Sequence, residues 1–235
     1  MSTHPGRHDP RTNHLLAALP PAALDRITPH LVRMPAEQGD ILIYAEQPVE
    51  RVYFPTAGLF SLVVRDAEGA GVEAAVAGRE GMLGTAVVLG ARMGSFEELC
   101  QVEGGVLALP ADVLREELQD RPVHQLLLLY VAALLYATGR NVACIRLHVA
   151  EKRLARWLLQ VRDRVESDSF MLTQEFLGHM LGVRRPTVTE AVATLEQAGL
   201  IRHQRGRIRI LDDAGLEAAA CEDYARIRDA VLLPG

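Results

Sequence analysis

The chain has 235 residues, 49% of them hydrophobic and 23% charged, which is enough for one large domain or two modest ones with packed cores. Its formal net charge of −5 gives the whole chain no preference for nucleic acid, so any DNA-binding surface must be a local patch. The three cysteines, Cys100, Cys144 and Cys221, are far apart and form no Cys-x-x-Cys pair, which predicts unpaired thiols in a reducing compartment.

The beginning of the chain is polar and carries no apolar segment of the kind found in secretion signals. We therefore expect residues 1–14 to form a disordered arm. The apolar run Leu126–Ala137 is shorter than the roughly 20 residues that a membrane helix needs. These features favour a cytoplasmic protein without a membrane partner.

Short β-type segments follow a helical start at residues 15–35 that is broken at Pro20 and Pro21. Glycine and proline separate them at regular intervals, which is typical of a β-barrel or jelly roll. The expected strands are Asp40–Tyr44, Arg51–Phe54, Gly58–Arg65, Gly71–Ala77 and Leu99–Leu109.

Beyond Pro110 the pattern becomes helical. Residues 111–122 predict a short amphipathic helix, and a long helix is expected over about 123–147. Spacings of four and three residues along it form a heptad seam, which would pair two chains as a homodimer. The alternative is a core helix lying on the β-barrel, and the two are compatible if different faces serve each purpose. The expected dimer residues are Leu127, Val131, Leu134, Thr138, Asn141 and Ile145.

A further amphipathic helix is predicted over residues 149–165, behind a hinge near Arg146–Val149. One face is apolar, and the arginines are expected to point elsewhere. The apolar face comprises Leu154, Trp157, Leu158 and Val161; the arginines are Arg153, Arg156, Arg162 and Arg164. For His148, at the hinge, we expect a surface or capping role rather than a pH or haem sensor.

The segment Thr173–Glu196 predicts two short helices joined by a tight turn. Thr173 is suited to cap the first helix, and Gly182 is suited to the left-handed residue that ends it. Pro186 is suited to the first turn of the second helix. Inward-facing apolar residues of the two helices are Phe176, Leu177, Met180, Leu181, Val188, Ala191, Val192 and Leu195. This arrangement is that of a helix-turn-helix.

Basic residues follow the same segment. Between residues 184 and 210 there are six arginines against two glutamates, and RHQRGRIRIL predicts a hairpin turning at Arg205-Gly206. The first residues of a recognition helix reach base edges, whereas a basic wing contacts phosphates. The alternative is a three-helix cap with solvated arginines. The expected DNA-binding residues are Thr173, Gln174, Arg184, Arg185, Thr187, Thr189, Glu190, Arg202, Arg205 and Arg207.

The order of these features resembles the Crp/Fnr family of bacterial regulators. The resemblance is carried by Gly39-Asp40-Ile41, Tyr53 and Gly58, by the long helix 123–147, and by the segments 173–175 and 182–188. It implies an α+β fold: an N-terminal β-roll (jelly roll) sensor domain over residues 15–147, a long dimerisation helix, and a C-terminal winged helix-turn-helix over residues 148–235. By the same match Arg185 takes a base-reading position and Gln174 a phosphate-contacting one. Pro186 and Glu190 stand where the family often carries Glu and Arg, which implies a different operator sequence.

The effector segment departs from the family's cyclic-nucleotide binders. Those hold the phosphate with a Gly-Glu-Leu turn and an Arg-Ser/Thr-Ala segment, but residues 78–102 contain no Gly-Glu-Leu, and Glu97 and Glu98 lie near where the arginine should be. Carboxylates repel a phosphate, so we expect no binding of cyclic AMP. Residues 1–40 contain no cysteine, which excludes the family's usual iron–sulfur cluster.

Enzyme motifs such as Gly-x-Ser-x-Gly and His-Glu-x-x-His do not occur. We therefore expect no enzymatic activity, no metal ion and no cofactor. The sequence predicts a homodimeric transcriptional regulator that binds double-stranded DNA at an inverted repeat, with RNA polymerase as a partner if it activates. Whether an unidentified small molecule acts on the β-roll is left open. The alternatives are an effector-independent regulator and a β-roll protein-interaction module with weak DNA binding.

Overall fold

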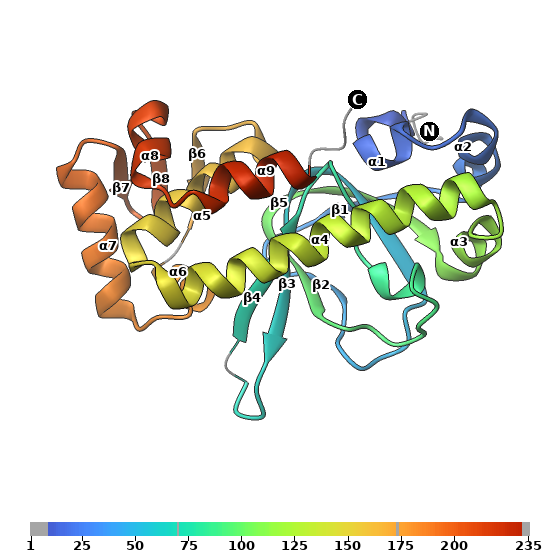
Figure 1. Ribbon diagram of the computed structural model, residues 1–235, viewed down its shortest axis with the longest axis horizontal. Helices are drawn as coiled ribbons and strands as arrows, with labels where there is room; N and C mark the ends of the chain where they lie inside the picture. Colours follow the sequence, from blue (N-terminus) through green and yellow to red (C-terminus); the bar gives the residue numbers. More distant parts are fainter. Residues whose placement is uncertain (1–8, 70, 173, 232–235) are drawn as a thin grey trace, which may run out of the picture.

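The computed structural model describes residues 9–69, 71–172 and 174–231, and its fold is of the expected α+β class. One antiparallel sheet curls into a roll with strand order β1-β5-β3-β4, and β2 also pairs with β5 (Figure 1). The strands of the roll are β1 Val32–Ala36, β2 Ile41–Ile43, β3 Arg51–Arg65, β4 Gly71–Ala77 and β5 Glu97–Pro110.

Two long strands give the roll its curvature. The segments expected as separate strands, Arg51–Phe54 and Gly58–Arg65, are one continuous strand β3, whose pairing with β5 shifts register between Pro55 and Phe60. Such bulges bend a strand and increase its twist. Gly58, at φ +86°, and Gly104 lie where the strands approach closely: a Cβ on Gly104 would lie 2.2 Å from the Ala57 carbonyl oxygen. Strand β1 was not among the predicted strands.

The beginning of the described chain corrects one expectation. Residues 9–14, assigned above to a disordered arm, have defined structure: the Asn13 side chain is fully buried and donates to the carbonyl oxygens of Pro55 and Gly81, at 3.0 and 2.8 Å. Its oxygen also caps the following helix at Leu16 N–H. Residues 1–8 lie outside the described residues. The helices of this part are η1 Pro10–Thr12, α1 His14–Ala17, α2 Pro21–Ile27, η2 Thr28–His30, η3 Thr85–Val87 and α3 Ala111–Glu117.

Helix α4, Arg121–Leu147, runs across the roll and on towards the C-terminal helices (Figure 1). Its inner face contributes Leu127, Tyr130 and Leu134 to the core of the roll. By length and composition alone the helix could span a membrane, a weak test that the core helix of a soluble protein also passes. The apolar part of α4 is therefore longer than the run Leu126–Ala137 that the sequence suggested.

The C-terminal part is built around a second hydrophobic cluster, which also includes Leu59 and Val76 of the roll. A three-stranded sheet of order β6-β8-β7 packs with five helices. Strand β6 and the last two helices were not predicted. The elements are α5 Ala150–Val165, β6 Ser169–Met171, α6 Gln174–Leu181, α7 Arg185–Gln197, β7 Ile201–Gln204, β8 Arg207–Ile210, α8 Asp213–Ala219 and α9 Asp223–Val231.

Candidate DNA-binding interface and the junction behind it

Helices α6 and α7 form the helix-turn-helix that the sequence predicted. Gly182 ends α6 with φ +59°, and Val183 N–H bonds back to the Gly178 carbonyl oxygen at 3.0 Å. A left-handed residue at this place satisfies carbonyl groups that the helix end leaves open. All the expected inward-facing residues of α7 are at most 3% exposed: Val188, Ala191, Val192 and Leu195.

The first turns of α7 present polar side chains to solvent. Arg184, Arg185, Thr189 and Glu190 are exposed, and Thr187 is half-buried. Helix α7 lies at the end of the molecule away from the roll (Figure 1). Thr173 lies outside the described residues, and Gln174 is placed only as the first residue of α6.

Strands β7 and β8 form the expected hairpin. Its turn residues, Arg205 and Gly206, both have positive φ, 51° and 75°. Two left-handed central residues make the turn that matches the twist of a two-residue hairpin. Alternate residues point inward, as buried Ile208 and Ile210 show, and the wing arginines are exposed: Arg202, Arg205, Arg207 and Arg209.

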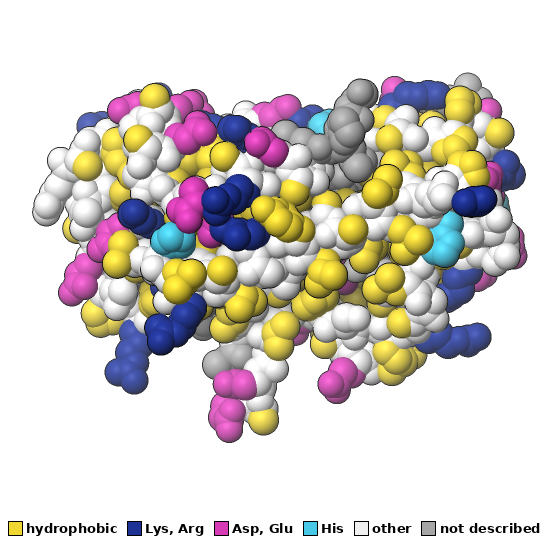
Figure 2. Space-filling view, viewed as in Figure 1, with side chains coloured by type: hydrophobic (Ala, Val, Ile, Leu, Met, Phe, Trp, Pro, Cys, Tyr) yellow, Lys and Arg dark blue, Asp and Glu magenta, His cyan; other side chains and the backbone are white. Residues whose placement is uncertain are grey.

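The outer face of α4 is apolar and exposed. Figure 2 shows hydrophobic side chains along the band that this helix occupies in Figure 1. The exposed members recur every three or four residues, and Leu129 and Leu135 are 64% and 71% exposed. We call them the outer stripe of α4: Leu128, Leu129, Ala132, Leu135, Tyr136, Gly139 and Val142.

Half of the predicted dimer seam faces the roll of its own chain. Leu127, Leu134 and Asn141 are 1%, 6% and 6% exposed, because they pack against the roll within one chain. Val131, Thr138 and Ile145 are half-buried. Heptad spacing occurs on both faces of α4. The outer stripe is displaced by one residue from the predicted seam, which is a rotation of about 100° around a helix of 3.6 residues per turn.

A buried polar network joins the roll to helices α4 and α5. Glu73, on β4, accepts hydrogen bonds from the Ser61 hydroxyl and from the Trp157 indole, the latter at 2.9 Å. Its carbonyl oxygen accepts from the Asn141 amide at 2.7 Å, and the Asn141 oxygen accepts from Arg156 at 2.6 Å. Burial raises the pKa of Glu73 to about 7, and its hydrogen bonds oppose the shift.

The arginines of α5 correct another expectation. Arg153 and Arg156 were expected to point away from the core, but each is 5% exposed. Arg164 forms an ion pair with Glu80 of the roll at 2.7 Å, and both side chains are more than nine-tenths buried. The amphipathic pattern missed these contacts because the partners are polar groups rather than apolar ones: Arg153 donates to the Ile145 carbonyl oxygen and Arg156 to Asn141, both on α4, whereas the partner of Arg164 lies on the roll.

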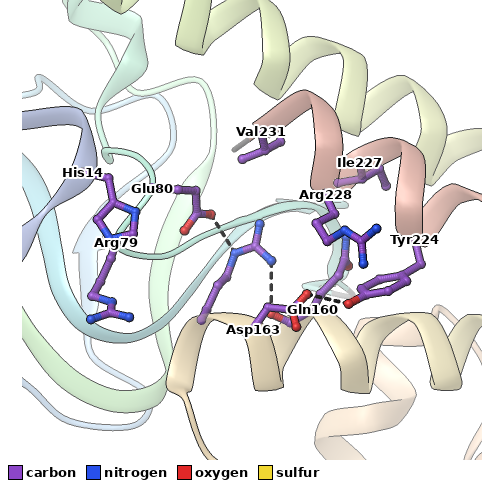
Figure 3. A pocket seen from close by; sticks show the side chains of 10 residues that line it. His14, Arg79, Glu80, Gln160, Asp163, Tyr224, Ile227, Arg228 and Val231 are labelled. Carbon is purple, nitrogen blue, oxygen red and sulfur yellow. Dashed lines mark hydrogen bonds and ion pairs between the residues drawn. The ribbon is translucent and has the colours of Figure 1, made fainter. Parts of the chain in front are cut away.

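A cavity of about 270 Å³ opens beside this ion pair. Figure 3 shows Arg79 and Glu80 from the roll on one side and Tyr224 and Arg228 from α9 on the other. The Tyr224 hydroxyl donates to Asp163 at 2.8 Å. The cavity therefore borders both parts of the chain.

Tyr130 and Glu98 are two polar side chains buried in the roll. Tyr130, from α4, is 1% exposed and donates to the Met82 carbonyl oxygen at 3.1 Å. Glu98 is 2% exposed and accepts from Gly84 N–H at 2.9 Å. Burial raises the pKa of Glu98 to about 8.

Four metal-ligating side chains meet where α4 ends and α9 begins. Their ligand atoms lie within 4.8 Å of one another, and they belong to Cys144, His148, Cys221 and Asp223. The sulfur atoms of Cys144 and Cys221 are 3.3 Å apart, and both residues are free thiols. His148 ends α4 with its backbone N–H bonded to the Cys144 carbonyl oxygen, which agrees with the expected capping role.

This cluster was not predicted from the sequence, although one signal was present. Cys144 and His148 are four residues apart at the end of the predicted long helix, and the bond from the His148 N–H to the Cys144 carbonyl oxygen keeps the two residues close. The other two ligands come from a segment for which no element had been predicted.

Comparisons with known proteins agree with this architecture. Residues 152–219 match the family model of the Crp-like helix-turn-helix domain. A curated relative, the CRP-like cAMP-activated global transcriptional regulator of Mycobacterium tuberculosis, is 26% identical over 210 residues, covering 85% of this chain and 93% of the relative.

Solved structures share the fold. A putative Crp/Fnr-family regulator from Eubacterium rectale matches with a TM-score of 0.66 at 20% identity, over 89% of this chain and 98% of the other. FixK2 from Bradyrhizobium japonicum matches with a TM-score of 0.70 at 16% identity, over 81% and 98%. Residues 152–219 therefore carry a Crp-like helix-turn-helix domain, and with its β-roll and its long helix the chain has the fold of Crp/Fnr-family regulators.

Proposed function

We propose that two copies of the chain bind an inverted-repeat DNA operator, with α7 of each copy in a major groove. The observation that carries this proposal is the exposed arginine pair at the start of α7, beside a wing with four exposed arginines. The local excess of positive charge lies in a chain with net charge −5. Helices docked in this way read half-sites about one helical turn, roughly 34 Å, apart.

Base contacts are assigned to the first turns of α7. Arg184 and Arg185 project at its N-terminal end, Thr189 and Glu190 follow one turn later, and half-buried Thr187 lies beside them. Arginine is the usual bidentate partner of guanine. Phosphate contacts are assigned to the wing residues Arg202, Arg205 and Arg207, and to Thr173 and Gln174.

The homodimer is assigned to the outer stripe of α4. Its exposed leucines, valine and tyrosine would remain in water in a single chain. Burying them against the same stripe of a second copy forms a self-complementary, twofold interface. That arrangement also places the two α7 helices for the two halves of an inverted repeat.

We also propose that the chain regulates transcription without binding cyclic AMP. The curated relative is described as cAMP-activated. In this chain the stretch that would hold the phosphate contains buried Glu98, and Tyr130 fills the space above Gly81 and Met82. This packing favours either effector-independent binding or an effector that acts at the junction. We place the protein in the cytoplasm, with RNA polymerase as a partner if it activates.

Operator selection from random DNA, followed by affinity measurements on single-base variants, tests the proposal. Replacing Arg185 by Ala should cost about 1–3 kcal/mol on the selected site and relax preference at one base pair per half-site. Replacing Arg205 by Ala should weaken specific and non-specific DNA alike and lower the salt slope by about one. Arg92, exposed on the roll, is the matched control, and Arg92→Ala should leave DNA affinity unchanged.

Two results contradict the proposal. If no sequence is enriched and the chain is not retained on DNA at low salt, the chain is a β-roll interaction module. If Arg185→Ala lowers affinity equally on every operator variant, Arg185 contacts phosphate and the base contacts lie elsewhere on α7. For cyclic AMP, micromolar binding by calorimetry overturns the effector assignment.

A further inference from the structure

We propose that a zinc ion binds between the end of α4 and the start of α9, in a site made by four side chains: Cys144, His148, Cys221 and Asp223. This site lies apart from the proposed DNA contacts, and metal binding to it does not depend on the proposed function. Three of its ligands are at most 3% exposed: Cys144, Cys221 and Asp223.

The distances suit one ion. Tetrahedral zinc, with bonds of about 2.3 Å to sulfur and about 2.0–2.2 Å to nitrogen and oxygen, places its ligand atoms about 3.3–3.8 Å apart. The two sulfur atoms are 3.3 Å apart, and His148 Nε2 lies 3.7 Å from Asp223 Oδ2. The separation between Cys221 Sγ and Asp223 Oδ2 is 4.0 Å. Side-chain shifts of a few tenths of an ångström to about one ångström close these atoms around an ion.

The donor set identifies the kind of metal. Two thiolates, one imidazole and one carboxylate are borderline-soft ligands, which suit zinc better than magnesium or calcium. Four protein ligands in a buried position make a closed, structural site rather than a catalytic one.

Neighbouring cations orient and balance the ligands. Arg140 binds Asp223 Oδ1, with its Nε at 2.6 Å, so that Oδ2 remains directed towards the cysteines. Partners of this kind fix ligand orientation at metal sites. Two thiolates, one carboxylate and a divalent ion leave one negative charge, which Arg140 offsets.

A disulfide between Cys144 and Cys221 is the competing use of the same atoms. It would require the two sulfur atoms to approach to about 2.05 Å. A disulfide uses two of the four groups and gives His148 and Asp223 no part, whereas a metal ion uses all four. The convergence of four ligands of three chemical types from two segments therefore favours the ion.

Zinc would fasten α9 to α4. Cys144 lies in the last turn of α4 and His148 is the C-cap of that helix, whereas Cys221 precedes α9 and Asp223 begins it; α9 packs along α4. A ligand that binds only the folded state raises its stability. At saturating zinc we expect the Tm to rise by about 5–10 °C and amide exchange in α9 to slow.

The test uses the full chain, reduced and freed of metal by chelation. Calorimetry with zinc chloride should give one zinc per chain. Cobalt(II), used as a spectroscopic substitute, should give the visible bands of a tetrahedral site and a near-ultraviolet thiolate-to-cobalt band. Cys144→Ser, Cys221→Ser and His148→Ala should each weaken metal binding at least about tenfold, and the two cysteine variants should also reduce the thiolate band.

Matched controls separate this site from adventitious binding. Cys100→Ser changes the thiol inside the roll, and His124→Ala changes the histidine near the other end of α4. Glu222→Gln changes an exposed carboxylate that also lies 3.7 Å from His148 Nε2. All three should keep one zinc per chain and the cobalt spectrum.

Three outcomes overturn the proposal. The first is no zinc uptake at micromolar concentration by reduced chain whose circular dichroism shows it folded. The second is equal loss of metal in the site variants and in Cys100→Ser. The third is a Cys144–Cys221 disulfide that forms in air and persists when zinc is supplied in excess.

Discussion

Replacing Leu135 by Asp should separate the proposed dimer while leaving each chain folded. Leu135 lies in the outer stripe of α4 and is 71% exposed in the single chain. A charge at this position therefore stays hydrated in the monomer and is desolvated only when a second copy packs against it. Leu134, the next residue along the helix, is 6% exposed and packs into the core of the roll. The two leucines therefore separate dimerisation from folding.

The size of the effect follows from the area available for burial. Full burial of a leucine contributes about 1.5–3 kcal/mol, so the exposed part of Leu135 supplies about 1–2 kcal/mol per chain, and twice that per dimer. Losing this contribution should raise the dimer Kd about 30- to 1,000-fold. Two carboxylates facing each other across the twofold axis add repulsion.

Sedimentation velocity over a range of protein concentrations measures the dimer Kd, and urea unfolding measures the stability of each chain. Leu135→Asp should be monomeric at concentrations where the wild type is dimeric, with little change in the monomer's circular dichroism. Leu134→Ala should lose about 2–5 kcal/mol of unfolding free energy and remain dimeric where it is folded. If Leu135→Asp stays dimeric and folded Leu134→Ala is monomeric, the interface lies on the other face of α4.

Three further predictions concern the roll and the junction. Burial raises the pKa of Glu98 from 4.5 to about 8, so its contribution to stability is full below pH 4.5 and is lost as the pH rises through 8. Glu98→Gln should remove this loss, which is about 1.4 kcal/mol per pH unit. Urea unfolding at pH 5 and pH 8 should then show a smaller difference in unfolding free energy than in the wild type, and an unchanged difference contradicts the prediction. Gly81→Ala would place a Cβ 2.2 Å from the Tyr130 hydroxyl oxygen, so it should destabilise the chain by about 1–3 kcal/mol, and by less in a Tyr130→Ala background. Arg164→Met leaves Glu80 buried without its ion-pair partner and should cost about 3–5 kcal/mol, most of which Glu80→Leu in the same chain should restore; no recovery in the double variant shows that Arg164 acts through other contacts.

Local sequence signals were sufficient where neighbouring residues determine the structure. Strand β4 has the predicted bounds, Gly71–Ala77. Gly182 has the left-handed backbone that its residue type suggested, and the hairpin turns at Arg205-Gly206 as predicted. The inward faces of α6 and α7 also followed from spacing alone. In each case the evidence lies within a few residues of the feature.

The errors arose where distant segments decide the outcome. Helix α4 is apolar on two faces, so its heptad pattern fits Leu134 and Leu135 equally well, and only packing against the roll distinguishes them. Asn13 lies in a polar stretch that suggested disorder, but carbonyl groups of Pro55 and Gly81 accept its amide protons. The partner of Cys144 is 77 residues away.

The contacts at the junction suggest how a signal from the roll could reach α7 although no continuous helix connects the roll to the C-terminal part. Helices α4 and α5 are separated by two residues with extended backbone, His148 and Val149, so the helical backbone is interrupted at the hinge. The angle of the C-terminal part must then be held by side-chain contacts, namely Trp157 to Glu73, Arg164 to Glu80, and α9 along α4.

Such contacts can break and re-form together, which gives two discrete orientations of the C-terminal part rather than a continuous range of orientations. A ligand that favours one arrangement by about 3 kcal/mol shifts its population more than 100-fold, and breaking one buried ion pair has that magnitude. In the proposed dimer, the two half-sites of an inverted repeat would fix the spacing of the α7 helices at about 34 Å, so a small rotation at the hinge would change DNA affinity strongly. An effector therefore needs to act only where the roll meets α5 and α9, and it need not enter the interior that Tyr130 and Glu98 already occupy.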